Sequence, residues 1–373
     1  MKIVSVMTSD AHGGAEYAAV DMLDALHERG HETVLLTNLP ELVDGRGVRA
    51  RRIDLGRKLS NSSYRRLGLR WPQLALRLRA ELEHERPYDV LLVHYKKEQL
   101  LSALLPAQLR AQLVWAEWGP VPKQMRRGLA RVLYVMAARR ATHVLAVSAR
   151  TRDSICEVGV PAARVQVVPN AVRVEQSRFS AQGRVRVRSA HQIPADALVI
   201  GCVARLHPKK RNDVAVDAVV RLGWPNVHLI IAGEGEAEAD LRRRAHPLGE
   251  RAHFLPNPGN DIANVLSACD VAVFCPSPTE GAPLAVIHSM LASRPCIAAA
   301  REGAGGLIVP GTGTIVSPEN DPAALAAALR DYLEDPARRE REGAQGRKLA
   351  ERTYGAATVA VQIERLLLLR DAG

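Results

Sequence analysis

The chain has 373 residues, of which 47% are hydrophobic, 24% charged and 4% aromatic, and its formal net charge is +11. This composition is that of a globular protein and excludes a wholly disordered, collagen-like or disulfide-stapled chain. A single hydrophobic core rarely grows beyond roughly 250–300 residues, so we expect two domains. No apolar run reaches the roughly 18 residues of a membrane span, and the N-terminus turns polar after Met7, which predicts a cytoplasmic protein without a signal peptide.

The positive charge is concentrated in the first half of the chain. Residues 1–175 hold 27 basic and 18 acidic residues, and residues 118–152 hold 8 basic residues and no acidic one. Such a surface is either ordinary solvated arginine or a contact for an anionic membrane or a phosphorylated substrate. We expect no nucleic-acid partner, because interleaved aromatics, zinc-ligand spacing and a helix-turn-helix pattern are all missing from the sequence. For peripheral contact with an anionic membrane, the candidate is a basic amphipathic helix over Tyr64 to Leu82.

The predicted elements begin with a strand, a glycine turn and a helix. Lys2 to Met7 is apolar, Gly13 and Gly14 follow, and apolar residues then recur at helical spacing until Gly30. A second strand over 33–37 completes a βαβ unit, the start of a doubly wound parallel sheet. Further strands alternate with helical stretches and are predicted at 89–93, 111–115 and 143–147.

Residues 173–190 are polar and charged, and we place the linker between the domains there. A fresh strand over 198–203 restarts the alternation, and further strands are predicted at 227–232, 252–255, 271–275 and 295–299. We therefore expect α/β architecture with Rossmann-like domains over 1–175 and 176–352, and a C-terminal helix within 353–373 that packs back toward the first domain. Ligands should bind at the carboxyl ends of the strands, in a cleft between the two domains.

The sequence shows no metal-binding or disulfide pattern. The five cysteines are odd in number, have no CxxC spacing and lie mostly in apolar runs, so we interpret them as small core residues. No Asp-x-Asp pair occurs, and the acidic run from Glu234 to Asp240 is better explained as charge at a helix N-terminus. We expect neither a metal nor a bound cofactor.

Two loops of the second domain carry residues suited to phosphate and to sugar hydroxyls. The loop from Arg205 to Arg211 has four strongly basic side chains ahead of a helix, an arrangement that can hold a diphosphate. By itself it is equally a solvated basic loop. The loop from Pro276 to Pro283 places Glu280 and Gly281 on a strand-to-helix turn, where the carboxylate can accept sugar hydroxyl hydrogens or simply stabilise the helix dipole.

Taken in order, the motifs of nearly the whole chain resemble those of the family 4 retaining glycosyltransferases, which have the GT-B fold of two Rossmann-like domains facing across a cleft. The family's R-L-x-x-x-K-G-x-D motif is matched with Arg211 in place of its glycine. The matching segments are Gly13-Gly14-Ala15-Glu16, Pro169-Asn170-Ala171-Val172, Arg205 to Asp213, Gly233-Glu234-Gly235, and Ala268-Cys269-Asp270 followed by Pro276-Ser277.

The resemblance implies roles for these residues, with a nucleotide sugar as co-substrate. Arg205 and Lys210 would hold the donor diphosphate and stabilise its departing charge, and Glu280 would bind the donor sugar. The backbone around two glycine loops and one helix start would also approach the donor; these residues are Gly13, Gly14, Gly233, Gly281, Ala282, Pro283 and Leu284.

Two departures from the family pattern bear on the site. His288 stands where the family has a second glutamate for the ribose hydroxyls, and a neutral imidazole cannot accept a bidentate pair. Trp118 stands where the family has a histidine before a glycine. The acceptor-side candidates are therefore His94, Glu117 and Trp118 itself, with His12 as a further histidine.

Three functions compete on these observations. The first is a retaining glycosyltransferase that moves a sugar to an acceptor hydroxyl on a natural product, a glycan or a lipid-linked molecule. The second, motivated by His288 and Trp118, is a catalytically degenerate GT-B protein that binds a nucleotide or sugar as a partner subunit. The third is another GT-B enzyme such as an epimerase or phosphorylase. The sequence favours the first and predicts cytoplasmic location, with peripheral membrane contact as an open alternative.

Overall fold

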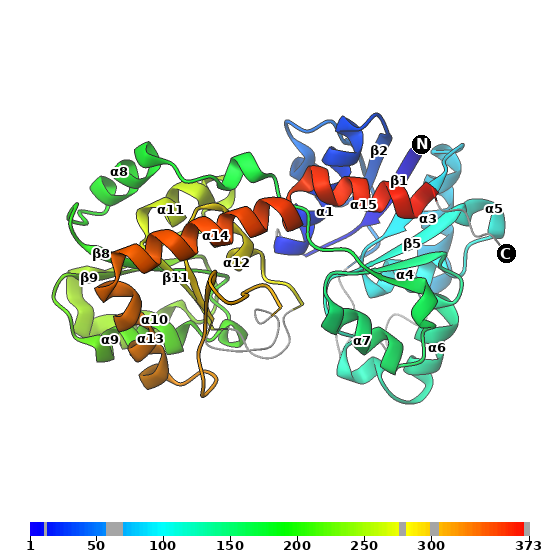
Figure 1. The fold of residues 1–373 in the computed structure, drawn as a ribbon. Coiled ribbons are helices and arrows are strands. Elements are labelled where there is room, and N and C mark those ends of the chain that lie inside the picture. The colour runs from blue at the N-terminus through cyan, green and yellow to red at the C-terminus, as the bar shows by residue number, and fades with distance from the viewer. Residues whose placement is uncertain (11–12, 57–69, 276–280, 299–305, 369–373) are drawn as a thin grey trace. The chain divides into compact units, whose positions relative to one another are not determined.

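The computed structural model describes residues 1–10, 13–56, 70–275, 281–298 and 306–368, which divide into two compact units. The first unit comprises Met1–Ala171 together with the residues from Ala356 on, and the second comprises Val172–Gly355. Each unit has one parallel sheet with helices on both faces (Figure 1). The predicted α/β class is confirmed.

The sheet of the first unit has the strand order β3-β2-β1-β4-β5-β6-β7, and every neighbouring pair is parallel. The predicted strands all form, and two short strands that were not predicted, β3 and β7, close its edges. The strands are β1 (Lys2–Met7), β2 (Glu32–Thr37), β3 (Arg49–Arg52), β4 (Val90–Val93), β5 (Gln112–Glu117), β6 (His143–Ala146) and β7 (Val165–Val167).

Two hydrophobic clusters lie on opposite faces of this sheet. Helices α1 (Gly14–Glu28) and α15 (Ala356–Leu368) cover one face and pack against each other. The helices that cover the other face are α3 (Trp71–His84), α4 (Lys96–Ser102), α5 (Ala107–Arg110), α6 (Gly128–Ala138) and α7 (Ala149–Glu157). Helix α1 ends where predicted, because Gly30 takes the left-handed conformation (φ +89°) and its amide donates to the His27 carbonyl over 2.8 Å.

The second unit repeats this plan with the strand order β10-β9-β8-β11-β12-β13, again with parallel pairs throughout. The strands are β8 (Leu198–Val203), β9 (Val227–Ala232), β10 (Ala252–Leu255), β11 (Val271–Phe274), β12 (Cys296–Ala298) and the unpredicted β13 (Gly313–Ile315). The helices are α8 (Ala181–Ala190), α9 (Asn212–Leu222), α10 (Glu238–Ala245), α11 (Ile262–Ala268), α12 (Leu284–Leu291), α13 (Pro322–Glu334) and α14 (Pro336–Tyr354). Figure 1 shows α9, α10 and α13 on one side of the sheet and α8, α11 and α14 on the other, as the core clusters require.

The linker predicted over 173–190 is wrong for most of its length, because Ala181–Ala190 forms helix α8 and packs against α11. Two arginines one turn apart explain why so polar a sequence is helical and docked. Arg188 donates to the Ala268 carbonyl (3.0 Å) and to Asp270 Oδ2 (2.9 Å), and Arg184 reaches the other carboxylate oxygen of Asp270 over 2.8 Å. The positive charges are therefore matched inside the unit rather than solvated.

Two further expectations can be compared with the structure. All five cysteines are free, and all but the partly buried Cys156 lie in the core, which confirms their interpretation as core residues. None of the helices that the structure describes is long and apolar enough to cross a membrane.

Candidate functional site

The two sheets each contain one point where the strand order reverses, and ligands of doubly wound folds bind at the carboxyl ends of the strands there. In the second unit the reversal lies between β8 and β11, and in the first it lies between β1 and β4. The basic loop follows β8, whereas His94 directly follows β4. The sequence-predicted residues thus gather at two edges, one in each unit.

The basic loop presents cations at the edge of the second sheet. Arg205 is exposed, and no hydrogen bond or ion pair joins its guanidinium to any residue that the structure describes. Lys210 ends the short 3-10 helix η5 (Pro208–Lys210), and its Nζ lies 5.6 Å from the ring centroid of Phe274, the last residue of β11. The loop after β8 therefore reaches the carboxyl end of the neighbouring strand. This is a suitable place to bind an anion.

Two glycines hold this loop against the end of β9. Gly233 has φ +145°, and a Cβ on it would lie 2.0 Å from the Ala204 carbonyl oxygen. The Leu206 amide donates to the Glu234 carbonyl over 2.8 Å, which fixes the backbone on either side of Arg205. The structure thus gives Gly233 a packing role, and its contact with the donor stays a prediction.

Arg211 occupies the position at which the family motif has glycine. Its φ of +49° is left-handed, a conformation that glycine adopts without steric cost, so the structure explains the family's preference. Its Nε donates to Asp213 Oδ1 over 3.1 Å, within the first turn of α9. In this chain, the residue at the strained backbone position thus forms an ion pair with a side chain two residues further on.

Residues 276–280 of the loop after β11, Glu280 among them, lie outside the described residues. Pro283 precedes the first residue of α12, and no side chain caps that helix. Because proline has no N–H, Pro283 cannot donate to a ligand, whereas the Leu284 amide at the start of α12 can. The predicted contacts of Gly281 to Leu284 with the donor are not tested by these observations.

His288 lies on α12 in a partly buried position. Its Nδ1 is 2.6 Å from Ser177 Oγ, and burial lowers the pKa of His288 to about 4. The ring is therefore neutral at pH 7, with one nitrogen that donates and one that accepts. Ser177, which the sequence did not single out, therefore helps to fix the orientation of the His288 ring.

In the first unit, His94 is buried at the end of β4. Its Nε2 lies 2.7 Å from Ser5 Oγ on β1, whereas its Nδ1 has no hydrogen-bond partner among the residues that the structure describes. The ring stacks on Trp118, with 5.7 Å between centroids and 11° between planes. Burial lowers the pKa of His94 to about 3, so the unpartnered nitrogen belongs to a neutral imidazole. The structure thus brings two of the three acceptor-side candidates together.

The glycine loop of the first unit leads into a buried acid. Gly13 is the N-cap of α1, which begins at Gly14, and a Cβ on Gly13 would lie 2.8 Å from Glu16 Oε2. Glu16 accepts hydrogen bonds from Ser9 Oγ (2.5 Å) and from the Tyr95 hydroxyl. His12 lies outside the described residues.

A second buried pair lies at the same edge. Lys97 is 1% exposed, donates to Thr8 Oγ1 over 3.0 Å and lies 3.5 Å from Glu98, whose pKa is raised by burial. The sequence reasoning missed these residues together with Ser9 and Tyr95. The available signal was their position directly after β1 and β4.

Glu117, the third acceptor-side candidate, is buried and fully engaged. One carboxylate oxygen accepts from Lys96 Nζ and the other from the Tyr134 hydroxyl over 2.8 Å. Burial lowers the pKa of Lys96 and raises that of Tyr134. Glu117 and Trp118 also line a small hollow with Pro169 and Ala171. The predicted acceptor role of Glu117 stays untested.

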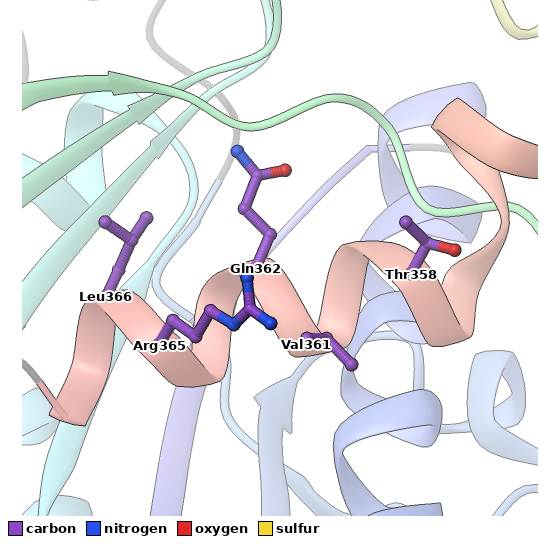
Figure 2. A pocket seen from close by; sticks show the side chains of 5 residues that line it. All are labelled: Thr358, Val361, Gln362, Arg365 and Leu366. Atoms are coloured by element: carbon purple, nitrogen blue, oxygen red, sulfur yellow. The ribbon is translucent and has the colours of Figure 1, made fainter.

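A more open hollow lies elsewhere, along α15 (Figure 2). Figure 2 shows side chains three or four residues apart on one helix face, and Gln362 Nε2 donates to the Val167 carbonyl over 2.8 Å. None of the sequence-predicted site residues lines it. Its lining residues are Thr358, Val361, Gln362, Arg365 and Leu366. Within the described residues, no group of three or more His, Cys, Asp or Glu side chains is arranged to hold a metal ion.

Two Rossmann-like units, with a glycine-supported cationic loop in the second, define a GT-B glycosyltransferase. Comparisons with known proteins agree. Residues 12–176 match the family described as Glycosyltransferase Family 4, and residues 184–349 match the family described as Glycosyl transferases group 1. The chain therefore belongs to the family 4 glycosyltransferases.

Relatives over the full length of the chain carry glycosyltransferase names. The D-inositol 3-phosphate glycosyltransferase of Kineococcus radiotolerans is 29% identical over 96% of this chain and 90% of its own length. The 2-deoxystreptamine N-acetyl-D-glucosaminyltransferase of Streptomyces fradiae is 27% identical over 98% of this chain and 93% of its own. The same fold occurs in Anabaena HepE, solved in complex with UDP and glucose, with a TM-score of 0.83, 21% identity and coverage of 99% and 100% of the two chains.

Proposed function

We propose that this glycosyltransferase binds the diphosphate of a nucleotide sugar at the basic loop of its second unit and transfers the sugar, with retention of configuration and without a metal ion, to an acceptor hydroxyl held by its first unit. The observation that carries the proposal is Arg205, an exposed guanidinium without a partner in the described part of the chain, on a backbone fixed by Gly233 and Gly235. A cation held in place before the ligand arrives needs little reorganisation to bind it.

Charge supports the absence of a metal in the proposed reaction. A departing nucleoside diphosphate develops negative charge that must be neutralised in the transition state. Arg205 offers a planar fork for two phosphate oxygens, and Lys210 offers a compact ammonium group nearby. Together with the amides at the start of α12, these cations would supply the charge that other enzymes take from a divalent ion.

In the proposed reaction, the acceptor oxygen forms its bond to the anomeric carbon on the face from which the diphosphate leaves. The bond from that carbon to the phosphate oxygen breaks, and the acceptor's proton passes to a released phosphate oxygen. Attack on the departing face retains the configuration, and no protein base is needed. This mechanism is the one that membership of the family implies, and it is consistent with Trp118 at the position of the family's histidine.

For the acceptor, the first unit offers His94 Nδ1, a buried nitrogen beside Trp118 to which no described residue is hydrogen-bonded. An unpaired buried polar atom is costly, so a ligand hydroxyl that satisfies it gains affinity. The full-length relatives are named for D-inositol 3-phosphate and 2-deoxystreptamine. We propose a small hydroxyl-bearing acceptor of comparable polarity. Neither relative's name favours the non-catalytic alternative.

The first experiment is a thermal-shift panel with UDP, GDP, ADP, TDP and CDP, each with EDTA present. A nucleotide at 100 times its dissociation constant adds about 2.7 kcal/mol to the unfolding free energy, which is readily seen as a shift in Tm. We expect one base to stand out, and Lys210→Ala to lose that shift while Lys209→Ala keeps it. A shift that requires added Mg²⁺, or none at all, would contradict the metal-free donor site.

The second experiment is the anomeric configuration of the product, read by NMR once a donor sugar is found. UDP-glucose is the first donor to test because HepE was solved with it. A product with the donor's configuration supports retention. An inverted product would refute the proposed mechanism even if the donor site is correct.

A further inference from the structure

The outward face of α6, in the first unit, is an exposed apolar stripe. Leu129 is 73% exposed, Met136 60%, Leu133 51% and Val132 50%. These positions are three, four and seven residues apart, so they lie on one side of the helix. Tyr134, Ala137 and Ala138 on the opposite side are buried in the core, so α6 is apolar on both sides.

Exposed leucines are common singly, but four large apolar side chains in a row on one short helix indicate a contact surface. The other exposed large apolar residues that the structure describes are scattered over different elements. The contrast with α3 is informative, because Leu78 and Leu82 of that helix are buried and Trp71, Leu74 and Ala75 pack on the same core. Leu76, at 63%, is the one large apolar side chain of α3 that is exposed.

The charged residues that flank the apolar stripe in the sequence are all basic. Residues 118–152 contain eight Lys or Arg and no Asp or Glu. Lys123, Arg127 and Arg139 are exposed, and none of them has a partner among the described residues. Arg126, Arg131 and Arg140 donate to backbone carbonyls, as Arg131 does to that of Val158 over 2.8 Å, whereas Arg152 pairs with Asp153.

From this arrangement we propose that α6 is a docking helix for an anionic lipid surface. Leu129, Val132, Leu133 and Met136 would enter the boundary between head groups and acyl chains, while the flanking cations meet lipid phosphates. Charge complementarity favours an anionic lipid surface over a second copy of the chain as the partner of this helix. A second copy of this chain would bring the same row of cations against itself, so a homodimer through this face is disfavoured.

This assignment moves the proposed membrane contact away from the segment over Tyr64 to Leu82, which was the candidate in the sequence. Residues 64–69 lie outside the described residues, and α3, which begins at Trp71, uses its apolar face inside the unit. Helix α6 keeps its second apolar face for a partner. The proposal does not depend on the donor site, because lipid binding is measured without turnover.

The test is flotation of the full chain with vesicles of phosphatidylcholine alone and with vesicles that contain about one-third phosphatidylglycerol. We expect at least tenfold more protein on the anionic vesicles. The double variant Leu133→Ser, Met136→Ser should lower that binding about tenfold, whereas Leu76→Ser, equally exposed on α3, should not. Arg127→Gln with Arg139→Gln should weaken binding further than Lys348→Gln with Arg352→Gln, which removes the same charge from the second unit.

Because all substituted side chains are exposed, Tm should stay within about 2 °C of the parent, which separates lost binding from lost folding. Equal recovery of the parent protein with both kinds of vesicle would overturn the proposal. So would a loss with Leu76→Ser as large as that of the α6 variant. A dimer in analytical ultracentrifugation that Leu133→Ser, Met136→Ser converts to monomer would show instead that the stripe joins two copies.

Discussion

The two sheets reverse their strand order at equivalent points, but the polar side chains at these points differ in burial and in pairing. Between β1 and β4 the polar groups are buried and bonded to one another, as Ser9 and Tyr95 are to Glu16. At the edge formed by β8 and β11, the Arg205 side chain is exposed and has no partner among the described residues. The first edge is therefore shaped by its own hydrogen bonds, whereas the second keeps charge available for a ligand.

The difference has a physical reason. A buried charge is tolerated only when it is paired, so Glu117 is matched by Lys96 and Tyr134 inside the first unit. An exposed cation needs no such partner, and it can be fixed by its backbone alone, as the glycines after β9 fix Arg205. Substitutions at the first edge should therefore reduce stability, and those at the second should reduce activity.

The largest expected effect is on stability at the first edge. Glu117→Ala leaves the Lys96 ammonium buried without its carboxylate, and we expect a loss of about 3–5 kcal/mol in unfolding free energy, measured by urea titration. Glu83→Ala is the control, because it breaks the exposed pair between Arg79 and Glu83 and should cost less than about 1 kcal/mol. If both variants lost the same unfolding free energy, the buried pair at the first edge would be no more important for stability than an exposed pair.

The next effect is on activity at the second edge. Arg205→Ala should lower kcat/KM at least 100-fold, a loss of roughly 2.7 kcal/mol of transition-state stabilisation. Because Arg205 has no internal partner, its removal should leave the urea midpoint unchanged. Lys209→Ala, on the same loop, should keep near-parental activity. An Arg205→Ala variant that is fully active, or one that unfolds more easily, would break the comparison.

A smaller effect is expected in the pH dependence of the unfolding free energy. The pKa of His94 is about 3 in the folded chain, below the value near 6.5 of an unfolded histidine, so the unfolded chain binds the proton first as pH falls. The stability that His94 contributes is present above about pH 6.5 and is lost below it, by up to about 1.4 kcal/mol per pH unit.

His94→Gln should therefore show a shallower decline of unfolding free energy between about pH 6.5 and 4.5, whatever its stability at neutral pH. The exposed His84→Gln is the control substitution. The measurement is a series of urea titrations across that range. A decline as steep in His94→Gln as in the parent would show that His94 is not the group responsible.

The smallest expected effect is on nucleotide binding at the second edge. Ser177→Ala removes the hydroxyl that lies 2.6 Å from His288 Nδ1 and should weaken nucleotide binding about two- to tenfold by releasing the imidazole ring. Ser289→Ala, on the same helix as His288, is the control, because the Ser289 hydroxyl donates to the Ala285 carbonyl instead. Calorimetric titration of the nucleotide would distinguish them. If both variants bind as the parent does, His288 does not contact the nucleotide.

Much of the fold was determined by local pattern. The apolar runs of β1 and β8, the glycine after α1 and the alternation of strands with helices are each written in consecutive residues, and the structure places these elements within about two residues of the predicted bounds. The charged helix α8 escaped detection because its arginines are matched by Asp270, about eighty residues away. Long-range pairing of this kind leaves no local signal.

The sequence by itself determined the family, the two Rossmann-like units and the basic loop, because each rests on short motifs in a fixed order. Only the tertiary structure decided which side chains are available to a ligand. Glu117 and Arg205 are both charged residues near strand ends, yet one is sealed by Lys96 and Tyr134 while the other is exposed and unpartnered. Likewise α3 and α6 both carry several large apolar residues, and only packing shows that α6 keeps an apolar face uncovered. Burial depends on which elements meet in space, and periodicity along a single helix does not contain that information.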